Sequence, residues 1–435
     1  MAGIGDLSEY ERAQKIRVHG RESVYVAEEK IRAKVLISCV GGMRIHLSSH
    51  DFLHIQISSS SNTDPRLQGL VEPNLWPEEI PGNDKFRGPL FHSARWRYDI
   101  DLKDKDVIVV GTGCSAAQFV PQLTTKYGAK SVTQLMRSPP WVVPRQIPPF
   151  GTEGWEKWSR WICSNVPGFQ KGLRFLTFAL AEYDWRLFGS EDYNVKERKK
   201  LEDKLLAHMK KTVPKKYHEI LTPDYSIGCK RRIFDATWFP GLNDPAIELT
   251  TMPLTSVGEN TVTLGPGRTY PDPNDSKSSA PSHEVILPAD VIILANGFQT
   301  TKWLHPIEIT GRNGKKLLDV FDERGGPQMY MGMALDGFPN FFTIFGPNTA
   351  TGHSSIILAS ENMVNMVLKL IKPILKGDVA ITEIKKEAEL EWARDIQSAL
   401  KKRVWNTGGC QSWYQTEEGW NSAVYPYVSA PHPLT

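Results

Sequence analysis

Cysteine is scarce in this sequence of 435 residues, and its spacing suits neither a metal site nor a set of disulfides. The cysteines contain no CxxC pair, and their number is odd. They are Cys39, Cys114, Cys163, Cys229 and Cys410. This pattern predicts no disulfide framework and no metal site of the zinc type, and it favours a reducing compartment.

Long apolar runs and a large excess of one charge are also lacking. The apolar run Phe175–Ala181 is far shorter than the ~20 residues that span a bilayer, and the N-terminus has no apolar core of signal-peptide length. Lys and Arg number 52 against 49 Asp and Glu, which leaves a net charge of +3 and no basic run to grip nucleic acid. We therefore expect a cytoplasmic protein with no transmembrane segment and no nucleic-acid partner.

The composition is that of a globular protein with more than one domain. Hydrophobic residues make up 40% of the chain and charged residues 23%, which excludes a disordered or fibrous protein. At ~150 residues per domain, the length predicts two or three domains.

The clearest element of the sequence is a strand, a glycine turn and a helix that begin at Asp106 with DVIVVGTGCSAAQFVPQL. Further strands are expected at Ser131–Met136 and Asp290–Ala295, so the fold class is α/β with a parallel, doubly wound sheet. The turn suits the pyrophosphate of a dinucleotide, although a close-packed turn without a ligand has the same pattern. The candidate cofactor-binding residues here are Gly111, Thr112, Gly113, Ser115 and Ala116, with Ala116 in place of a third glycine.

The end of the second strand indicates which dinucleotide fits. An NAD site wants an acidic residue there to bind the ribose hydroxyls, whereas this strand is followed by Arg137. An arginine suits a 2′-phosphate, so NADPH is favoured over NADH. The alternative is a solvated surface arginine.

Three other segments have a recognisable character. Residues 154–218 are rich in Trp, Lys, Glu and Leu and predict a helical insertion. Residues 355–376 have helical periodicity and follow the glycine-containing loop GPNTATGHS. Residues 272–282 have the composition of a surface linker between two strands.

Residues 44–68 interrupt an otherwise regular pattern. His46, His50 and His54 follow one another at intervals of four, which on a helix would place possible metal ligands on one face. The segment also holds β-branched residues and four consecutive serines, which disfavour a helix, so a disordered insertion is the preferred interpretation. Translated non-coding sequence is a third possibility.

Before the glycine turn, the segment Phe86–Trp96 has the pattern FxGxxxHxxxW, and here the chain resembles the Baeyer-Villiger monooxygenases. These flavoproteins use FAD, NADPH and dioxygen to insert an oxygen atom beside a ketone. Arg97 departs from the longer fingerprint, which has Pro or Asp after the tryptophan. The resemblance implies that His92 acts in linking and moving domains, so it is not assigned as a proton carrier.

The resemblance extends to the segment Gly228-Cys-Lys-Arg-Arg. In the family, the lysine of a GxKR segment binds the phosphate of the nicotinamide cofactor, and its arginine lies beside the flavin. These roles fall on Lys230 and Arg231, and a permanently charged guanidinium there stabilises negative charge on the oxygenating species. Arg231 is the catalytic candidate, with Arg232 as the alternative of a shifted assignment and a salt-bridged structural arginine as the other interpretation.

Two C-terminal segments also resemble the family. FPNFFTIFGPNTATGHSS implies that Gly346, Asn348 and Gly352 lie on the flavin side of the site, before a helix whose N-terminus favours negative charge on the ring. Trp413, in an S-W-Y segment, is expected to line the cofactor and substrate cleft.

The resemblance implies a flavoprotein architecture with two dinucleotide-binding domains, a Rossmann-like NADP domain and an FAD domain. The family's first FAD-binding GxGxxG is not found, because Gly3-Ile-Gly5 follows no strand. We expect an incomplete FAD domain within residues 1–98, an NADP domain at 99–300 that contains the helical insertion, and a return to the FAD domain at 301–435.

The implied activity is oxidation of a small-molecule ketone to an ester or lactone, as in fungal members that act on polyketides in secondary metabolism, including mycotoxin pathways. One alternative is a flavin-dependent N- or S-hydroxylating monooxygenase, against which Trp96 and the GCKR segment argue. The other is an inactive truncated member of the family, or a protein that binds only NADP.

Overall fold

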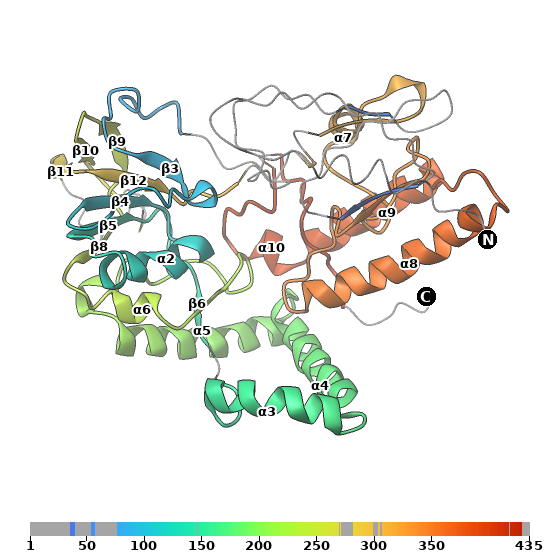
Figure 1. Cartoon of the computed structure of the whole chain (residues 1–435), viewed down its shortest axis with the longest axis horizontal. Helices are drawn as coiled ribbons and strands as arrows, with labels where there is room; N and C mark the ends of the chain where they lie inside the picture. The colour runs from blue at the N-terminus through green and yellow to red at the C-terminus, as the bar shows by residue number, and fades with distance from the viewer. Residues whose placement is uncertain are drawn as a thin grey trace, which may run out of the picture.

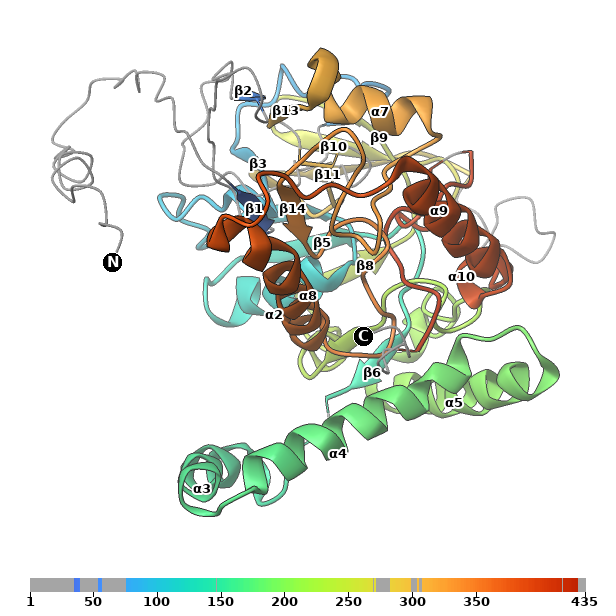
Figure 2. The same cartoon turned by 90° about the vertical axis from the view of Figure 1, so that its right-hand side faces the viewer.

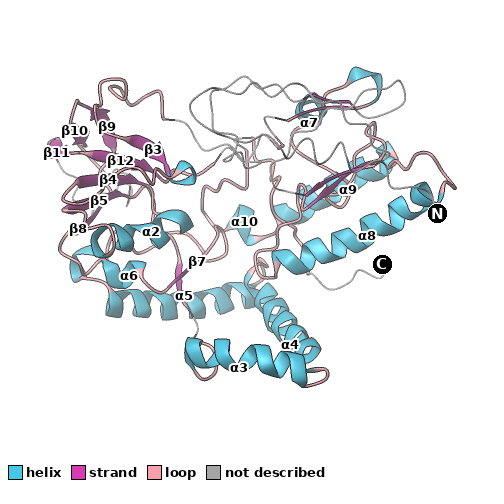
Figure 3. Cartoon of the chain, in the orientation of Figure 1, coloured by secondary structure: helices cyan, strands magenta, loops and turns pink. Residues whose placement is uncertain are grey.

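A computed structural model gives the fold of most of the chain. The structure describes residues 35–39, 54–56, 76–145, 147–268, 270, 282–298, 303–304, 307–416 and 418–428. The predicted linker at 272–282 falls outside these residues except for Ser282. The described part contains both helices and strands, as the secondary-structure view shows (Figure 3).

Five parallel strands form the main sheet, in the order β3-β12-β4-β5-β8. They are β3 (Leu90–His92), β4 (Asp106–Val110), β5 (Ser131–Leu135), β8 (Ile247–Thr250) and β12 (Val291–Leu294). β12 lies between β3 and β4, and its four residues VIIL are all buried, as expected of a strand covered on both faces. The predicted α/β class with a parallel sheet is confirmed.

The two faces of this sheet are covered by different layers (Figure 1). Val107 and Val109 of β4 face the helices α2 (Cys114–Thr125) and α6 (Trp238–Gly241). Ile108 points the other way because side chains alternate along a strand. It packs beneath an antiparallel sheet of β9 (Leu254–Val257), β10 (Thr261–Leu264) and β11 (Val285–Pro288).

Helices fill most of the chain between β6 (Val142–Pro144) and its parallel partner β7 (Ile233–Asp235). They include the region where the sequence predicted a helical insertion, and α3 and α4 lie at one end of the molecule in both views (Figure 2). The elements are α3 (Gly151–Asn165), α4 (Phe169–Tyr183), η3 (Asp184–Leu187), α5 (Asp192–Thr212) and η4 (Lys215–Tyr217). A tryptophan-lined core joins α5 and η3 to the C-terminal helices.

The C-terminal third is built around one short parallel pair, β1 (Leu36–Cys39) with β14 (Phe341–Ile344). Phe342 and Ile344 pack against Met363 and Val367 of the long helix α8. The remaining elements are η2 (Ser93–Arg95), β2 (His54–Gln56), β13 (Glu308–Thr310), η5 (Arg312–Gly314), α7 (Leu317–Glu323), α8 (Ile356–Lys376), α9 (Lys386–Lys401) and α10 (Val404–Thr407).

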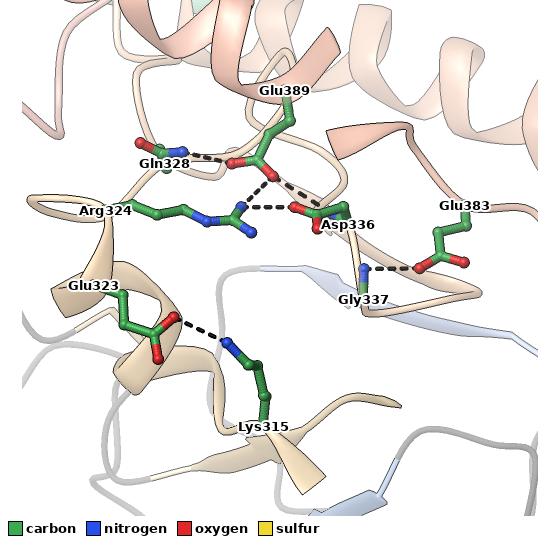
Figure 4. Close-up of polar contacts among 8 residues, drawn as sticks. All are labelled: Lys315, Glu323, Arg324, Gln328, Asp336, Gly337, Glu383 and Glu389. Atoms are coloured by element: carbon green, nitrogen blue, oxygen red, sulfur yellow. Dashed lines mark hydrogen bonds and ion pairs between the residues drawn. The ribbon is translucent and has the colours of Figure 1, made fainter. Parts of the chain in front are cut away.

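A buried polar network fastens α9 to the loop that follows α7 (Figure 4). Glu389 on α9 has no exposed side-chain surface, and its carboxylate accepts hydrogen bonds from Arg324 and from Gln328, the latter at 2.6 Å. The same guanidinium lies 2.7 Å from a carboxylate oxygen of Asp336. One guanidinium thus contacts two carboxyl groups in a largely buried site.

The sequence predicted no disulfide framework, but one pair of the described cysteines is bonded. Cys229 and Cys410 are joined by a disulfide across 181 positions of the sequence, with their Cα atoms 6.1 Å apart. Cysteine spacing cannot reveal such a pair, because the fold alone brings the two segments together. Cys114 and Cys163 are free.

The histidine-rich segment is only partly described. His46 and His50 lie outside the described residues. His54 begins β2, which pairs antiparallel with β13, so at this position the backbone is a strand and not the helix that a shared metal face would need. Among the described residues, no group of three or more His, Cys, Asp or Glu side chains is placed to hold a metal.

Candidate functional site

The glycine turn after β4 brings three segments of chain together at the carboxyl end of the sheet. Gly111 has φ +117°, and a Cβ there would collide with the carbonyl oxygen of Ala295, which follows β12. Its N–H donates to the Leu135 carbonyl of β5 at 2.9 Å. Only glycine allows this close approach.

The start of α2 beyond the turn is open. Gly113 is exposed, no side chain caps the helix, and no atom lies within 4 Å of where its Cβ would be. Ser115 is exposed beside it, whereas Thr112 and Ala116 are buried and hold the turn against the sheet. Uncapped amides at a helix N-terminus are a ready site for a phosphate group.

A buried glutamine that the sequence analysis did not select fixes the geometry of this turn. Gln134 on β5 has no exposed surface. Its amide donates to the Gly111 carbonyl at 2.9 Å, and its oxygen accepts from the Trp238 indole at 2.9 Å. A polar residue inside the strand SVTQL was the available signal, because a buried amide needs partners.

Arg137 and Lys230 meet beyond the end of β5. The Lys230 ammonium donates to the Ser138 hydroxyl at 3.0 Å and lies 4.6 Å from the centre of the Tyr225 ring. Burial lowers the pKa of Lys230, and the positive charge of the exposed Arg137 lowers it further, with Asp224 opposing. Within the described part of the chain Lys230 forms no ion pair, so a bound anion would stabilise its positive charge.

The two arginines that follow Lys230 differ in exposure and in contacts. Arg231 is exposed and makes no hydrogen bond or ion pair with another described residue. Arg232 has a side chain only 9% exposed, lies 3.5 Å from Asp184 and donates to the Gly352 carbonyl at 3.5 Å. Arg232 is therefore held by contacts within the chain, whereas the Arg231 side chain is exposed.

The pKa of the Tyr414 phenol responds both to Arg231 and to Cys114 at the start of α2. Burial raises the pKa of Tyr414 to about 12, while Arg231 and Arg232 act to lower it and Cys114 acts to raise it. These groups thus lie within electrostatic range of one phenol. Trp413 next to it is 51% exposed, with its ring centre 4.4 Å from that of Tyr414.

His92 and Trp96 brace the edge of the sheet. The His92 Nδ1 accepts a hydrogen bond from the Ala94 N–H at 3.1 Å and caps η2, and burial lowers the pKa of this imidazole. Its ring meets Phe298 edge to face, and Trp96 does the same with Phe91 and with Phe119 of α2. In this structure, His92 of the FxGxxxHxxxW segment caps a short helix, and both His92 and Trp96 pack against neighbouring aromatic rings.

The predicted flavin-side residues lie in the loop before α8. Asn348 is buried and donates to the carbonyls of Asn421 at 2.7 Å and Val424 at 3.2 Å. Gly346 lies against the carbonyl of Gly332, and a side chain at Gly352 would overlap the Phe188 ring. The structure thus gives all three a role in packing this loop against its neighbours.

A buried histidine in the same loop escaped the sequence analysis. The His353 side chain is fully buried, its Nε2 lies 3.1 Å from Glu182 of α4, and burial lowers its pKa although Glu182 opposes the shift. Trp185 and Phe188 flank its ring. The contact ties the helical region to the loop, and nothing in its local sequence separates it from a surface histidine.

Two further observations concern the described residues as a whole. A hollow of about 760 Å³ opens between Ser190, Asp395 and Tyr427, and none of the predicted site residues lines it. No helix in the described ranges is long and apolar enough to cross a membrane.

Comparisons with known proteins agree on the kind of protein that this chain resembles. The family model for flavin-binding monooxygenase-like proteins matches residues 68–152, which contain both the FxGxxxHxxxW segment and the glycine turn. A Baeyer-Villiger monooxygenase of Streptomyces coelicolor is 31% identical over 355 residues, which are 81% of this chain and 63% of the relative. An FAD-binding monooxygenase of Aspergillus niger, ktnD, is 30% identical over 80% of this chain and 54% of its own length.

The fold has a counterpart among solved structures. The crystal structure of OTEMO in complex with FAD and NADP superposes with a TM-score of 0.62 at 22% identity, covering 83% of this chain and 70% of that one. The described part of the chain therefore shares its fold with that protein. The chain spans less than two thirds of the length of the two curated relatives.

Proposed function

This chain is homologous to the Baeyer-Villiger monooxygenases, and from that premise we propose that it serves an FAD- and NADPH-dependent oxidation that inserts oxygen beside a ketone. The observation that carries the proposal is that Lys230, bonded to Ser138 beyond the end of β5, lies next to the strand whose glycine turn leads to the open start of α2. Ligands of doubly wound sheets bind at this edge.

The nicotinamide cofactor fits residues that the structure describes. The uncapped amides of α2 would hold its pyrophosphate, and Gly111 lets the backbone pass close behind it. Lys230 and Arg137 would take the 2′-phosphate, since two cations that form no ion pair with a described residue gain from a doubly charged anion. These contacts support NADPH over NADH.

The flavin would lie between this half of the molecule and the loop before α8. Gly346, Asn348 and Gly352 keep that loop compact, and the first amides of α8 suit negative charge on a ligand. FAD, once reduced by NADPH, supplies the chemistry that activates dioxygen. Trp413 is exposed beside the buried Tyr414 and would line the cleft.

Arg231 is proposed to stabilise negative charge on the reacting oxygen. Its guanidinium stays positive at every working pH. Tyr414 beside it keeps its proton at neutral pH, because its pKa lies at about 12. Arg232 holds the segment in place through Asp184 and the Gly352 carbonyl.

The substrate is proposed to be a small ketone of fungal polyketide metabolism, with mycotoxin pathways included. The similarity to an Aspergillus FAD-binding monooxygenase supports a fungal setting of this kind. The reaction would yield an ester or a lactone.

Arg231→Ala tests the assignment in protein loaded with FAD, after excess flavin is removed and retention is checked by visible absorption. Ester formation from a ketone should fall about 100-fold, because one charge-stabilising group is lost from the transition state, and Arg231→Lys should recover part of the rate. Arg394→Ala, on an exposed position of α9, is the control.

Undiminished ester formation by Arg231→Ala would reject this role for Arg231. An N-oxide or S-oxide without any ester would favour hydroxylation of a heteroatom. A colourless protein would mean that these residues do not hold the flavin by themselves.

A further inference from the structure

The disulfide between Cys229 and Cys410 joins two segments that the proposed function places at the cofactor site. Cys229 directly precedes Lys230 and Arg231, and Cys410 lies three residues before Trp413. The cross-link therefore joins the segment that carries Lys230, proposed for the nicotinamide phosphate, to the segment that carries Trp413, proposed to line the cleft.

The position of Lys230 depends on the residue before it. Cys229 is fully buried, and the backbone of Gly408 packs against its side chain. The Ser226 N–H donates to the Gly408 carbonyl at 2.8 Å, and the Cys229 N–H donates back to Ser226 at 3.2 Å. Because Cys229 is held both by its disulfide and by these hydrogen bonds, the backbone at Lys230 is restrained in position.

Lys230 needs that anchoring because its own contacts are few. Its ammonium has the Ser138 hydroxyl at 3.0 Å and the Tyr225 ring at 4.6 Å, and the neighbouring Arg137 repels it. A flexible lysine stem loses affinity for a phosphate when it must be ordered on binding. A cross-link one residue away reduces that ordering cost.

We propose that the Cys229–Cys410 cross-link positions Lys230 for a 2′-phosphorylated nucleotide, so that the oxidation state of this pair controls the preference for NADP over NAD. The inference rests on the nicotinamide site of the proposed function. Cys410 is only partly buried whereas Cys229 is fully buried, so a small thiol reagent would approach the pair from the side of Cys410.

The chemistry balances with a peroxide as oxidant and a dithiol as reductant. Two thiols lose two protons and two electrons as the S–S bond forms, and the O–O bond of hydrogen peroxide breaks to release two waters. In the reverse direction, a dithiol is oxidised to its own disulfide and leaves two protein thiols. In a reducing compartment the two cysteines would be thiols, and a rise in peroxide concentration would convert them to the disulfide.

The test measures binding of NADP⁺ and NAD⁺ to the full chain by calorimetry, after treatment with dithiothreitol or hydrogen peroxide and removal of either reagent. Peptide mapping first establishes which cysteines are paired. Reduction should weaken NADP⁺ binding about fivefold and leave NAD⁺ binding nearly unchanged. If the cross-link only stabilised the fold, its reduction would weaken the binding of NADP⁺ and of NAD⁺ to the same extent.

Variants separate this pair from the other cysteines. Cys410→Ser and Cys229→Ser should each bind NADP⁺ like the reduced protein and show no response to peroxide. Cys163→Ser, which removes a free cysteine on α3, should respond as the wild type does. Circular dichroism melting checks that each variant is folded, and either member of the pair suffices for the test.

Several results would overturn the inference. They are failure of the two cysteines to pair under peroxide, equal NADP⁺ binding in both redox forms, and an equal loss of NADP⁺ and NAD⁺ on reduction. Failure of both forms to bind either nucleotide would reject the nicotinamide site itself and the inference with it. Equal NADP⁺ binding in both forms would leave that site standing.

Discussion

Single residues at the glycine turn decide how closely the ends of neighbouring strands in the main sheet can pack. Gly111 is held between the ends of β4, β5 and β12, and Gln134 fastens its carbonyl from within the core. Gly113, two residues later, is exposed and has extended rather than left-handed backbone, with φ −73°. The two glycines of one motif therefore differ physically, the first needed for packing and the second for an open approach to the helix.

Gly111→Ala is expected to destabilise the protein by about 2–4 kcal/mol, since it adds a methyl group at positive φ against the Ala295 carbonyl. Gly113→Ala is the matched control, and it should change the free energy of unfolding by less than about 0.5 kcal/mol because nothing lies within 4 Å. Urea unfolding followed by circular dichroism measures both. Equal changes in the free energy of unfolding for the two variants would show that the turn shifts to accommodate a methyl group at Gly111.

At the scale of elements, the contact between α9 and the loop after α7 depends on a shared proton. Burial raises the pKa of Glu389 to about 7 from an ordinary 4.5, whereas Arg324 and Glu389 help to hold the pKa of Asp336 down against its own burial. The folded protein thus keeps a proton on Glu389 that the unfolded chain releases. Its free energy of unfolding must fall as the pH rises from about 4.5 to about 7.

Glu389→Gln should remove this pH dependence, because the amide has nearly the same shape and does not titrate. We expect the wild type to lose about 1–3 kcal/mol between pH 5 and pH 7.5 relative to the variant. Melting temperatures measured across that range provide the check. Parallel curves for the two proteins would mean that Glu389 titrates with an ordinary pKa when folded.

The helices α3 and α4 form an element with no core of its own. Neither helix contains a buried residue, and Trp158, Trp161 and Phe175 are 51%, 57% and 71% exposed. α5, which follows, buries Arg198, Leu205 and Met209. Few buried contacts mean a low free energy of local opening.

Hydrogen exchange followed by mass spectrometry should therefore separate these helices. Amides of α3 and α4 are expected to exchange at least about tenfold faster than those of α5 under the same conditions. α5 is a suitable control because it belongs to the same helical region. Equal protection would show that α3 and α4 open only together with the rest of the molecule.

For the whole molecule, the sequence predicted the parallel sheet, the glycine turn and the main helices because each has its own periodicity. The strand predicted at residues 290–295 and the helix predicted at residues 355–376 agree with β12 and α8 to within one residue at each end. The boundaries of the domains and the roles of the site residues stay predictions. Their placement depends on contacts between distant segments, which no local pattern encodes.

The features missed by the sequence analysis are all of that long-range kind. Gln134 acts through Trp238, 104 residues away, and Glu182 meets His353 across 171 residues. The disulfide joins positions 181 apart, although the cysteine pattern argued against any framework. Polar groups in apolar strands remain the best signal for such contacts, because burial obliges them to find partners.

The place of β12 in the sheet has a consequence for synthesis of the chain on the ribosome. β4 is complete at residue 110, yet its neighbour on one side is made of residues 291–294. At roughly 5–20 residues per second, this edge of the nascent sheet stays open for about 10–40 s. A chaperone that shields apolar strand edges has that interval in which to act, and a stalled ribosome would lengthen it.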